Sequence, residues 1–337
     1  MKTTLLTYFL IFCIGLSYVK SQDIHFTQYQ ASPLLLNPAM TGLVDGKMRA
    51  TFHFREQWSS SMIKPFTTIG AAIDMPFLQN KVGNDWMGAG LTIVNDRAGE
   101  GQLQRTSVLG SVAYFKQLNR NNFLSAGGQI GFTQRSLGFS NFSFNNQYDD
   151  GFNPGLPTGE PLFTESITHV EFNVGVLWLL SASDYVNYYL GASARNITQP
   201  INSFMEDESQ GLPLVYNIHF GSEIQLTNRW FLYPSLLGMY SKQARQISGG
   251  ALVGYELMKD RRQQAMILGG TVYRMFDAIA PIVAFEYQTF RMGLSYDINL
   301  SDFNKVSNFQ GGPELVLNYQ IPLPVESQMG VIFCPRF

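Results

Sequence analysis

Apolar and polar residues alternate with a period of two along most of this chain. The clearest stretch is 47–58, where apolar residues occupy the even positions from Met48 to Phe54 and polar residues occupy the odd positions from Arg49 to Arg55. The pattern recurs in segments of about ten residues separated by polar turns, as in a membrane-spanning β-barrel, whose lipid-facing and lumen-facing residues alternate. A soluble β-sandwich shows the same alternation, but its strands usually have about 5–6 residues. The chain therefore favours the barrel.

We expect 14 strands, an even number as in single-chain bacterial barrels. They are predicted at 47–58, 66–77, 86–97, 102–116, 122–136, 167–180, 185–197, 213–226, 229–241, 246–258, 264–275, 278–288, 291–299 and 313–320. Short turns alternate with longer connections, and the three longest would all lie at one end, which we assign to the outside of the cell. The predicted fold is thus all-β, a transmembrane antiparallel β-barrel over residues 47–320.

The two ends of the chain depart from the strand pattern. Residues 1–21 have a basic start, an apolar core and a cleavage site near Ser21-Gln22, which together predict a secretory signal peptide. Residues 22–46 contain prolines and many apolar side chains, so we expect an ordered N-terminal segment at or in the barrel mouth. Residues 321–337 form a C-terminal tail in which Pro335 is unfavourable for a central strand.

Composition narrows the class of protein. Lys and Arg number 23 against 25 Asp and Glu, and this balance argues against a nucleic-acid-binding protein. Aromatic residues make up 14% of the chain and charged residues only 14%, which excludes a disordered chain. Removal of the signal peptide would leave Cys334 as the one cysteine, so no intramolecular disulfide is expected.

Charged residues at inward positions predict a polar lumen. A lysine or arginine on the lipid face costs about 2–4 kcal/mol at the midplane, so charges belong inside the barrel or at its rims. The candidate network is Arg49, Arg55, Arg135, Glu171, Arg195, Glu223, Arg291, Asp297 and Glu314. These residues could line a water channel or form a network across a plugged interior, and we favour the network because the two signs nearly balance.

The longest outer connection is rich in aromatic residues. Phe142, Phe144, Tyr148 and Phe152 lie among Asn, Asp, Gly and Pro, and functional outer loops are often of this kind. We take these four residues as the candidate partner-contact loop.

No motif in the chain predicts catalysis or cofactor binding. The four histidines have no metal-ligand spacing to one another. A Gly-x-Ser-x-Gly nucleophile elbow is absent, and the glycine pairs lie within strands. We therefore expect no catalytic residue, no metal and no cofactor, and a protein that is not an enzyme.

Several separated motifs resemble those of the PorP/SprF family. They run through the whole chain in order: Gln22 to Tyr29, Leu36-Asn37-Pro38-Ala39, Arg55-Glu56-Gln57-Trp58, Leu294-Ser295-Tyr296-Asp297, Gly311 to Leu315, and the ending Cys334-Pro335-Arg336-Phe337. The resemblance implies an outer-membrane protein of Bacteroidota that belongs to the type IX secretion system. It implies a role in the export or surface anchoring of a secreted protein through its C-terminal domain, including gliding adhesins, together with other secretion components.

Two other functions remain open at this stage. A diffusion porin or small-solute transporter would also need a polar lumen. A membrane-embedded hydrolase would need Ser, His and a carboxylate to converge, which barrel-face residues could supply by chance.

Overall fold

The computed structural model describes residues 26–58, 64–82, 84–99, 103–138, 144–148, 151–153, 155–157, 159, 166–204, 211–242, 244–260, 263–301 and 307–322. The predicted signal peptide and residues 323–337 of the predicted tail lie outside these ranges. No helix within the described residues has the length and apolarity needed to cross a bilayer.

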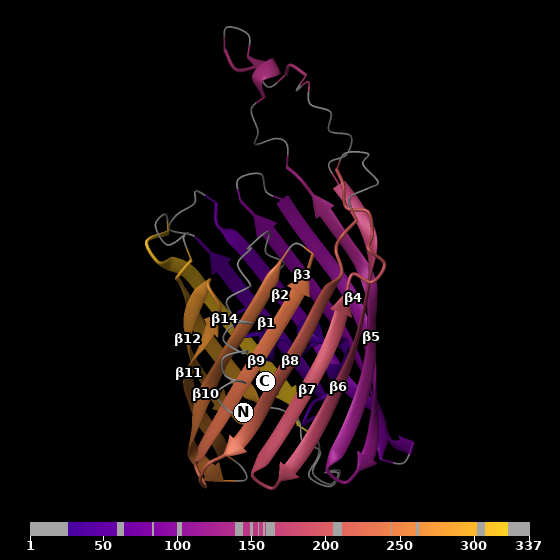
Figure 1. Ribbon diagram of the computed structural model, residues 1–337, viewed down its shortest axis with the longest axis vertical. Coiled ribbons are helices and arrows are strands. Elements are labelled where there is room, and N and C mark those ends of the chain that lie inside the picture. The colour runs from indigo at the N-terminus through magenta and orange to yellow at the C-terminus, as the bar shows by residue number, and fades with distance from the viewer. Residues whose placement is uncertain are drawn as a thin grey trace, which may run out of the picture.

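Fourteen antiparallel strands close into a single barrel (Figure 1). They are β1 Met48–Gln57, β2 Phe66–Val82, β3 Asp85–Ala98, β4 Leu103–Asn119, β5 Asn122–Ser136, β6 Ser166–Ser183, β7 Val186–Arg195, β8 Val215–Gln225, β9 Trp230–Ser241, β10 Arg245–Asp260, β11 Gln263–Arg274, β12 Ala278–Tyr287, β13 Phe290–Asn299 and β14 Gln310–Ile321. Each strand pairs with its neighbours in sequence, and β1 closes the sheet on β14. The predicted fold and strand number are confirmed.

Strand ends differ from the predicted ones by a few residues. The largest change is the extension of β2 to Val82, and β14 starts at Gln310 rather than at residue 313. Gln310 pairs with Ile298 beyond a register shift in β13, so an irregular pairing lengthens the strand where alternation of side chains gave no signal.

Apolar side chains cover the outer surface of the barrel. Phe132, Ile218 and Val283 are 64%, 61% and 59% exposed, although each lies in the middle of a strand. Their inward neighbours are buried, so the alternation predicted from sequence separates the two faces. Lipid provides no hydrogen-bond partner for a free strand edge, and closure through β1 and β14 removes both edges.

Residues 26–46 lie inside the barrel, and we call this segment the plug. It consists of short turns: the 3-10 helix η1 Tyr29–Ala31, the helix α2 Pro33–Leu36 and the 3-10 helix η2 Pro38–Met40. A proline begins both α2 and η2, where its missing N–H leaves no helical hydrogen bond unmade.

The plug is fixed to the wall by hydrogen bonds between side chains and backbone. Ser125 and Ser193 donate their hydroxyls to the carbonyl oxygens of Ala39 and Leu36, at 2.8 and 2.9 Å. The Asn37 amide donates to the carbonyl oxygen of Val176 at 2.9 Å. Polar backbone that enters the lumen is therefore paired with the wall, as burial requires.

Glycine allows the plug backbone to approach β3 closely. Gly42 has a φ of 77°, in the left-handed region that favours glycine. A Cβ at Gly88 would overlap the carbonyl oxygen of Thr41. Any side chain at Gly88 would therefore push the plug away from the wall.

The lumen is divided along its axis into two chemical zones. Towards the end with short turns, Trp86, Phe115 and Phe231 join an apolar cluster that includes Met40 and Leu43 of the plug. Charged side chains concentrate towards the end with long loops. Strands β9 and β11 show no clean alternation in the sequence because their inward residues pack on this apolar cluster.

Candidate functional site: the lumen and its plug

The backbone at the start of the plug is held by a buried carboxylate on β14. The backbone N–H groups of Thr27 and Gln28 donate to the two carboxylate oxygens of Glu314, each at 2.8 Å. Glu314 is 2% exposed, so this contact is made away from solvent. A carboxylate that accepts two successive N–H groups fixes the direction of the chain as well as its position.

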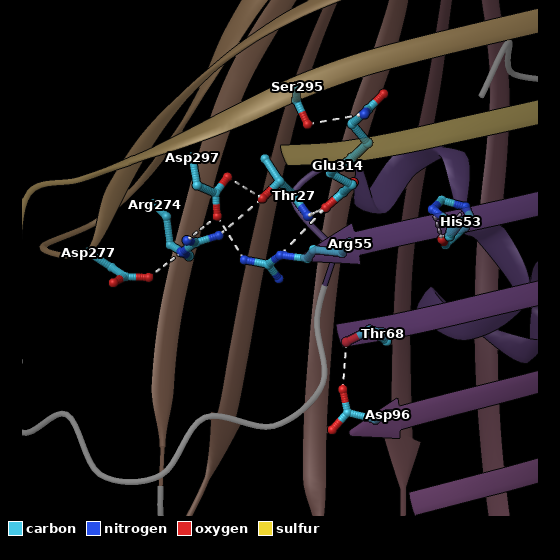
Figure 2. Close-up of polar contacts among 12 residues, drawn as sticks. Thr27, His53, Arg55, Thr68, Asp96, Arg274, Asp277, Ser295, Asp297 and Glu314 are labelled. Atoms are coloured by element: carbon cyan, nitrogen blue, oxygen red, sulfur yellow. Dashed lines mark hydrogen bonds and ion pairs between the residues drawn. The ribbon is translucent and has the colours of Figure 1, made fainter. Parts of the chain in front are cut away.

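Charged residues from three further strands surround this contact (Figure 2). Arg55 on β1 and Arg274 on β11 both donate to Asp297 on β13, at 2.7 and 2.8 Å. The Thr27 hydroxyl donates to the other oxygen of Asp297 at 2.7 Å, and Arg274 also pairs with Asp277. We call Thr27, Gln28, Arg55, Arg274, Asp277, Asp297 and Glu314 the outer network.

A second ion pair lies near the opposite end of the lumen. Arg49 donates through Nε and Nη2 to the two oxygens of Asp74, at 3.0 and 2.8 Å. Asp74 also accepts the backbone N–H of Gly42 at 2.8 Å, and both charged side chains are 1% exposed. This bidentate pair therefore anchors the last part of the plug.

A third charged group lies on β4, β5 and β6. Arg105 donates to Glu171 at 3.1 Å, and Thr133 donates to the same oxygen at 2.8 Å. Asn173 donates to the other oxygen at 3.1 Å. The Glu171 carboxylate thus accepts hydrogen bonds from three side chains although it is almost fully buried.

Two histidines of the lumen, His53 and His219, contact the plug directly. The Ser32 hydroxyl lies 2.6 Å from His53 Nε2, and the ring of Phe26 packs 4.6 Å from the His53 ring. The Asn37 amide nitrogen lies 3.1 Å from His219 Nε2. Among the described residues, no group of three His, Cys, Asp or Glu side chains comes together to hold a metal ion.

The nine residues predicted to line the lumen occupy different environments. Arg55, Asp297 and Glu314 meet in the outer network, whereas Arg49 and Glu171 belong to the two separate groups described above. The structure does not bring all nine together.

The remaining predicted residues lie elsewhere on the wall. Arg291 pairs with Glu286 at 3.1 Å beside the β12–β13 turn. The Arg135 guanidinium lies 5.7 Å from the centre of the Phe204 ring. Arg195 lines a cavity above the plug, and Glu223 is half-buried near the short turn that ends β8.

Four charged residues of these groups were missed from the sequence. Asp74 and Arg105 stand at inward positions of their strands, so the alternation in β2 and β4 could have identified them. Arg274 and Asp277 lie at the end of β11, where the alternation is poor. The backbone N–H groups of the plug leave no signal in the sequence.

The aromatic outer loop is described in part. Phe144 is half-buried and precedes the 3-10 helix η4 Asn145–Gln147. Tyr148 and Phe152 form an isolated β-bridge and are 70% and 50% exposed. Phe142 lies outside the described residues.

A closed barrel with an apolar exterior and a plug in its lumen defines a membrane β-barrel of the outer-membrane type. A solved structure shares this fold: the toluene transporter TbuX of Ralstonia pickettii has 9% identity and a TM-score of 0.51, over 91% of this chain and 97% of that one. The toluene transporter TodX of Pseudomonas putida has 10% identity and a TM-score of 0.48, over 89% and 93% of the two chains. No curated protein sequence matches the chain.

A family model identifies the chain more closely. The model described as type IX secretion system membrane protein PorP/SprF matches residues 18–319. The chain belongs to the PorP/SprF family, as the separated sequence motifs predicted.

Proposed function

We propose that this protein is a non-enzymatic outer-membrane component of the type IX secretion system. In this proposal it reaches the outer membrane after cleavage of the signal peptide near Ser21-Gln22, and it acts together with other secretion components. It supports the export or surface anchoring of a secreted protein through the C-terminal domain of that protein. The observation that carries the proposal is the family match, which spans almost the whole barrel and the plug.

The occupied lumen supports a binding role over free diffusion. The plug is bonded to the wall near both ends of the lumen, by Glu314 at one end and Asp74 at the other. Buried ion pairs flank both contacts, so the resting barrel holds its plug firmly. A protein whose pore is filled acts on partners at its mouths, and the long loops offer the larger surface.

The exposed aromatic pair of the outer loop is the proposed contact for the secreted partner. Tyr148 and Phe152 lie at the long-loop end, and large exposed aromatic side chains are enriched at protein interfaces. For cells that glide, we propose an adhesin as the secreted partner, in a bacterium of the Bacteroidota.

Deletion of the gene tests the main proposal. One or more surface proteins should disappear from the cell exterior, and gliding cells should lose motility. Mass spectrometry of the peptides that a protease releases from intact cells measures the surface proteins. An unchanged surface proteome together with unchanged motility would refute the proposal.

The variant Tyr148→Ser, Phe152→Ser tests the loop separately. It should reduce the same surface proteins while the barrel remains folded and present at the normal level. The matched control is Tyr185→Ser, which removes a tyrosine that is 61% exposed in a short turn at the opposite end. An equal loss of surface proteins in the control would contradict the assignment of the loop.

The alternative is a diffusion porin or small-solute transporter. The likeness to the toluene transporter TbuX and a cavity of about 70 Å³ above the plug favour it. Planar bilayer recordings separate the two functions, because a steady open pore of high conductance supports the porin and a silent barrel supports the plugged anchor.

A further inference from the structure

The cavity above the plug is lined partly by apolar and partly by charged side chains. Its volume is about 70 Å³, and it lies between the plug and the inner faces of β3, β4 and β6–β9. The plug contributes Leu35 and Leu36, and the opposite wall contributes Leu237 and Met239, which together make an apolar surface. A space of this size accepts the end of one chain rather than a folded domain.

Two guanidinium groups face this cavity together with one carboxylate. Arg105 and Arg195 line it on β4 and β7, and Glu171 lines it on β6. Glu171 is already satisfied by Arg105, Thr133 and Asn173, and its side chain is only 3% exposed. The Arg105 side chain is 20% exposed, so Arg105 is more accessible to an incoming anion than the carboxylate of Glu171.

A further acidic residue stands beside Arg105, outside the lining of the cavity. Asp96 lies opposite Arg105 in the β3–β4 ladder and accepts a hydrogen bond from Thr68. It is not among the residues that line the cavity. The lining found for the described residues therefore has one more positive than negative side chain.

A buried amide also faces this cavity without a complete set of partners. Asn217 lines the cavity, is 3% exposed, and donates through Nδ2 to Ser193 at 3.3 Å. Its Oδ1 has no hydrogen-bond partner. Since a buried acceptor without a donor is unfavourable, this oxygen provides a position for an N–H group of a ligand.

We propose that the cavity binds the C-terminal residue of a peptide with an apolar last side chain. The terminal carboxylate pairs with the guanidinium groups of Arg105 and Arg195. The backbone N–H of the last residue donates to Asn217 Oδ1, and the apolar side chain packs on Leu35 and Leu36. This inference rests on the proposed function and deepens it, because it gives the chemistry by which an exported chain is recognised.

The test uses the purified full mature barrel in detergent and a fluorescein-labelled tetrapeptide, Gly-Gly-Ala-Leu, with fluorescence anisotropy as the readout. The peptide with a free carboxylate should bind at least about tenfold more tightly than its C-terminal amide, because charge-assisted hydrogen bonds to the guanidiniums are lost. This comparison needs no variant, so it does not depend on the folding of a mutant.

Variants then assign the preference to residues. Arg195→Gln should abolish the preference for the free acid, and Asn217→Leu should weaken the binding of the acid. Arg245→Gln is the matched control, because Arg245 is exposed and lies over the Tyr240 ring on the outer part of the barrel. It should leave the preference unchanged.

Three outcomes would overturn the inference. The first is no measurable binding of the free acid, and the second is equal binding of acid and amide. The third is displacement of the peptide by dodecanoate with no effect of Asn217→Leu, which would assign the cavity to a free fatty acid.

The inference and the proposed function can fail separately. A deletion strain that loses surface proteins, combined with no preference for the acid, refutes the cavity assignment alone. A clear preference for the acid, combined with an unchanged surface proteome in the deletion strain, supports the cavity assignment and refutes the secretion role.

Discussion

Replacement of Asp74 by Asn should destabilise the barrel strongly because it breaks the ion pair that holds the end of the plug. Asp74 accepts three hydrogen bonds, two from Arg49 and one from the Gly42 N–H, and the charged pair is 1% exposed on both sides. Asn removes the negative charge that faces the buried Arg49 guanidinium. Loss of one partner of a buried pair costs about 3–5 kcal/mol. The unfolding equilibrium should therefore shift by between about 100-fold and 4,000-fold.

Urea-induced unfolding in detergent, followed by tryptophan fluorescence, measures this change. Trp86 is a suitable reporter because it is 3% exposed and stacked on Phe115 with ring centres 4.4 Å apart. The matched control is Asp184→Asn, which makes the same chemical change at an exposed turn and should alter the free energy of unfolding by less than about 0.5 kcal/mol.

A double variant gives a second test of the same reasoning. Arg49→Met combined with Asp74→Leu should recover much of the lost stability, because neither side chain then leaves a buried charge unpaired. If Asp74→Asn changes the free energy of unfolding by less than about 1 kcal/mol, the pair is not the anchor that its geometry indicates.

Two further substitutions probe the contact between plug and wall. Gly88→Val should displace the plug and raise single-channel conductance in planar bilayers, because its side chain would overlap plug backbone. Gly128→Val should leave conductance unchanged, because a Cβ there meets nothing within 4 Å, and equal conductance of the two variants would show that the plug does not close the lumen. Asn37→Ala should lower the free energy of unfolding by about 1–3 kcal/mol, since it removes the side-chain hydrogen bonds from Asn37 to the Val176 carbonyl oxygen and the His219 ring. If Asn37→Ala unfolds at the same urea concentration as the wild type, this prediction is wrong.

The barrel could be predicted from the sequence because its main constraint is local. Lipid on one side of each strand and the lumen on the other impose a period of two, and the segment from Met48 to Arg55 shows this without reference to any other part of the chain. The same argument placed charged residues such as Arg55, Asp297 and Glu314 on the inner face.

The partners of those residues could not be predicted, because pairing across a lumen depends on strand tilt and register rather than on local pattern. Glu314 binds backbone N–H groups of Thr27 and Gln28, and a backbone donor carries no residue-specific signal. The apolar half of the lumen was also missed. Inward residues such as Trp86 and Phe231 are apolar because the plug covers them, and this coverage is visible only in three dimensions.

The contact between the plug and Glu314 has a consequence for how the molecule is assembled. Glu314 and Arg55 face each other across the junction of the first and last strands, so they meet only when the sheet becomes a cylinder. The earliest residues of the described chain are thereby bound by a carboxylate of the last strand to be synthesised. A barrel whose final hairpin has not yet docked lacks this binding site and cannot retain its N-terminal segment, which ties sealing of the pore to completion of the wall.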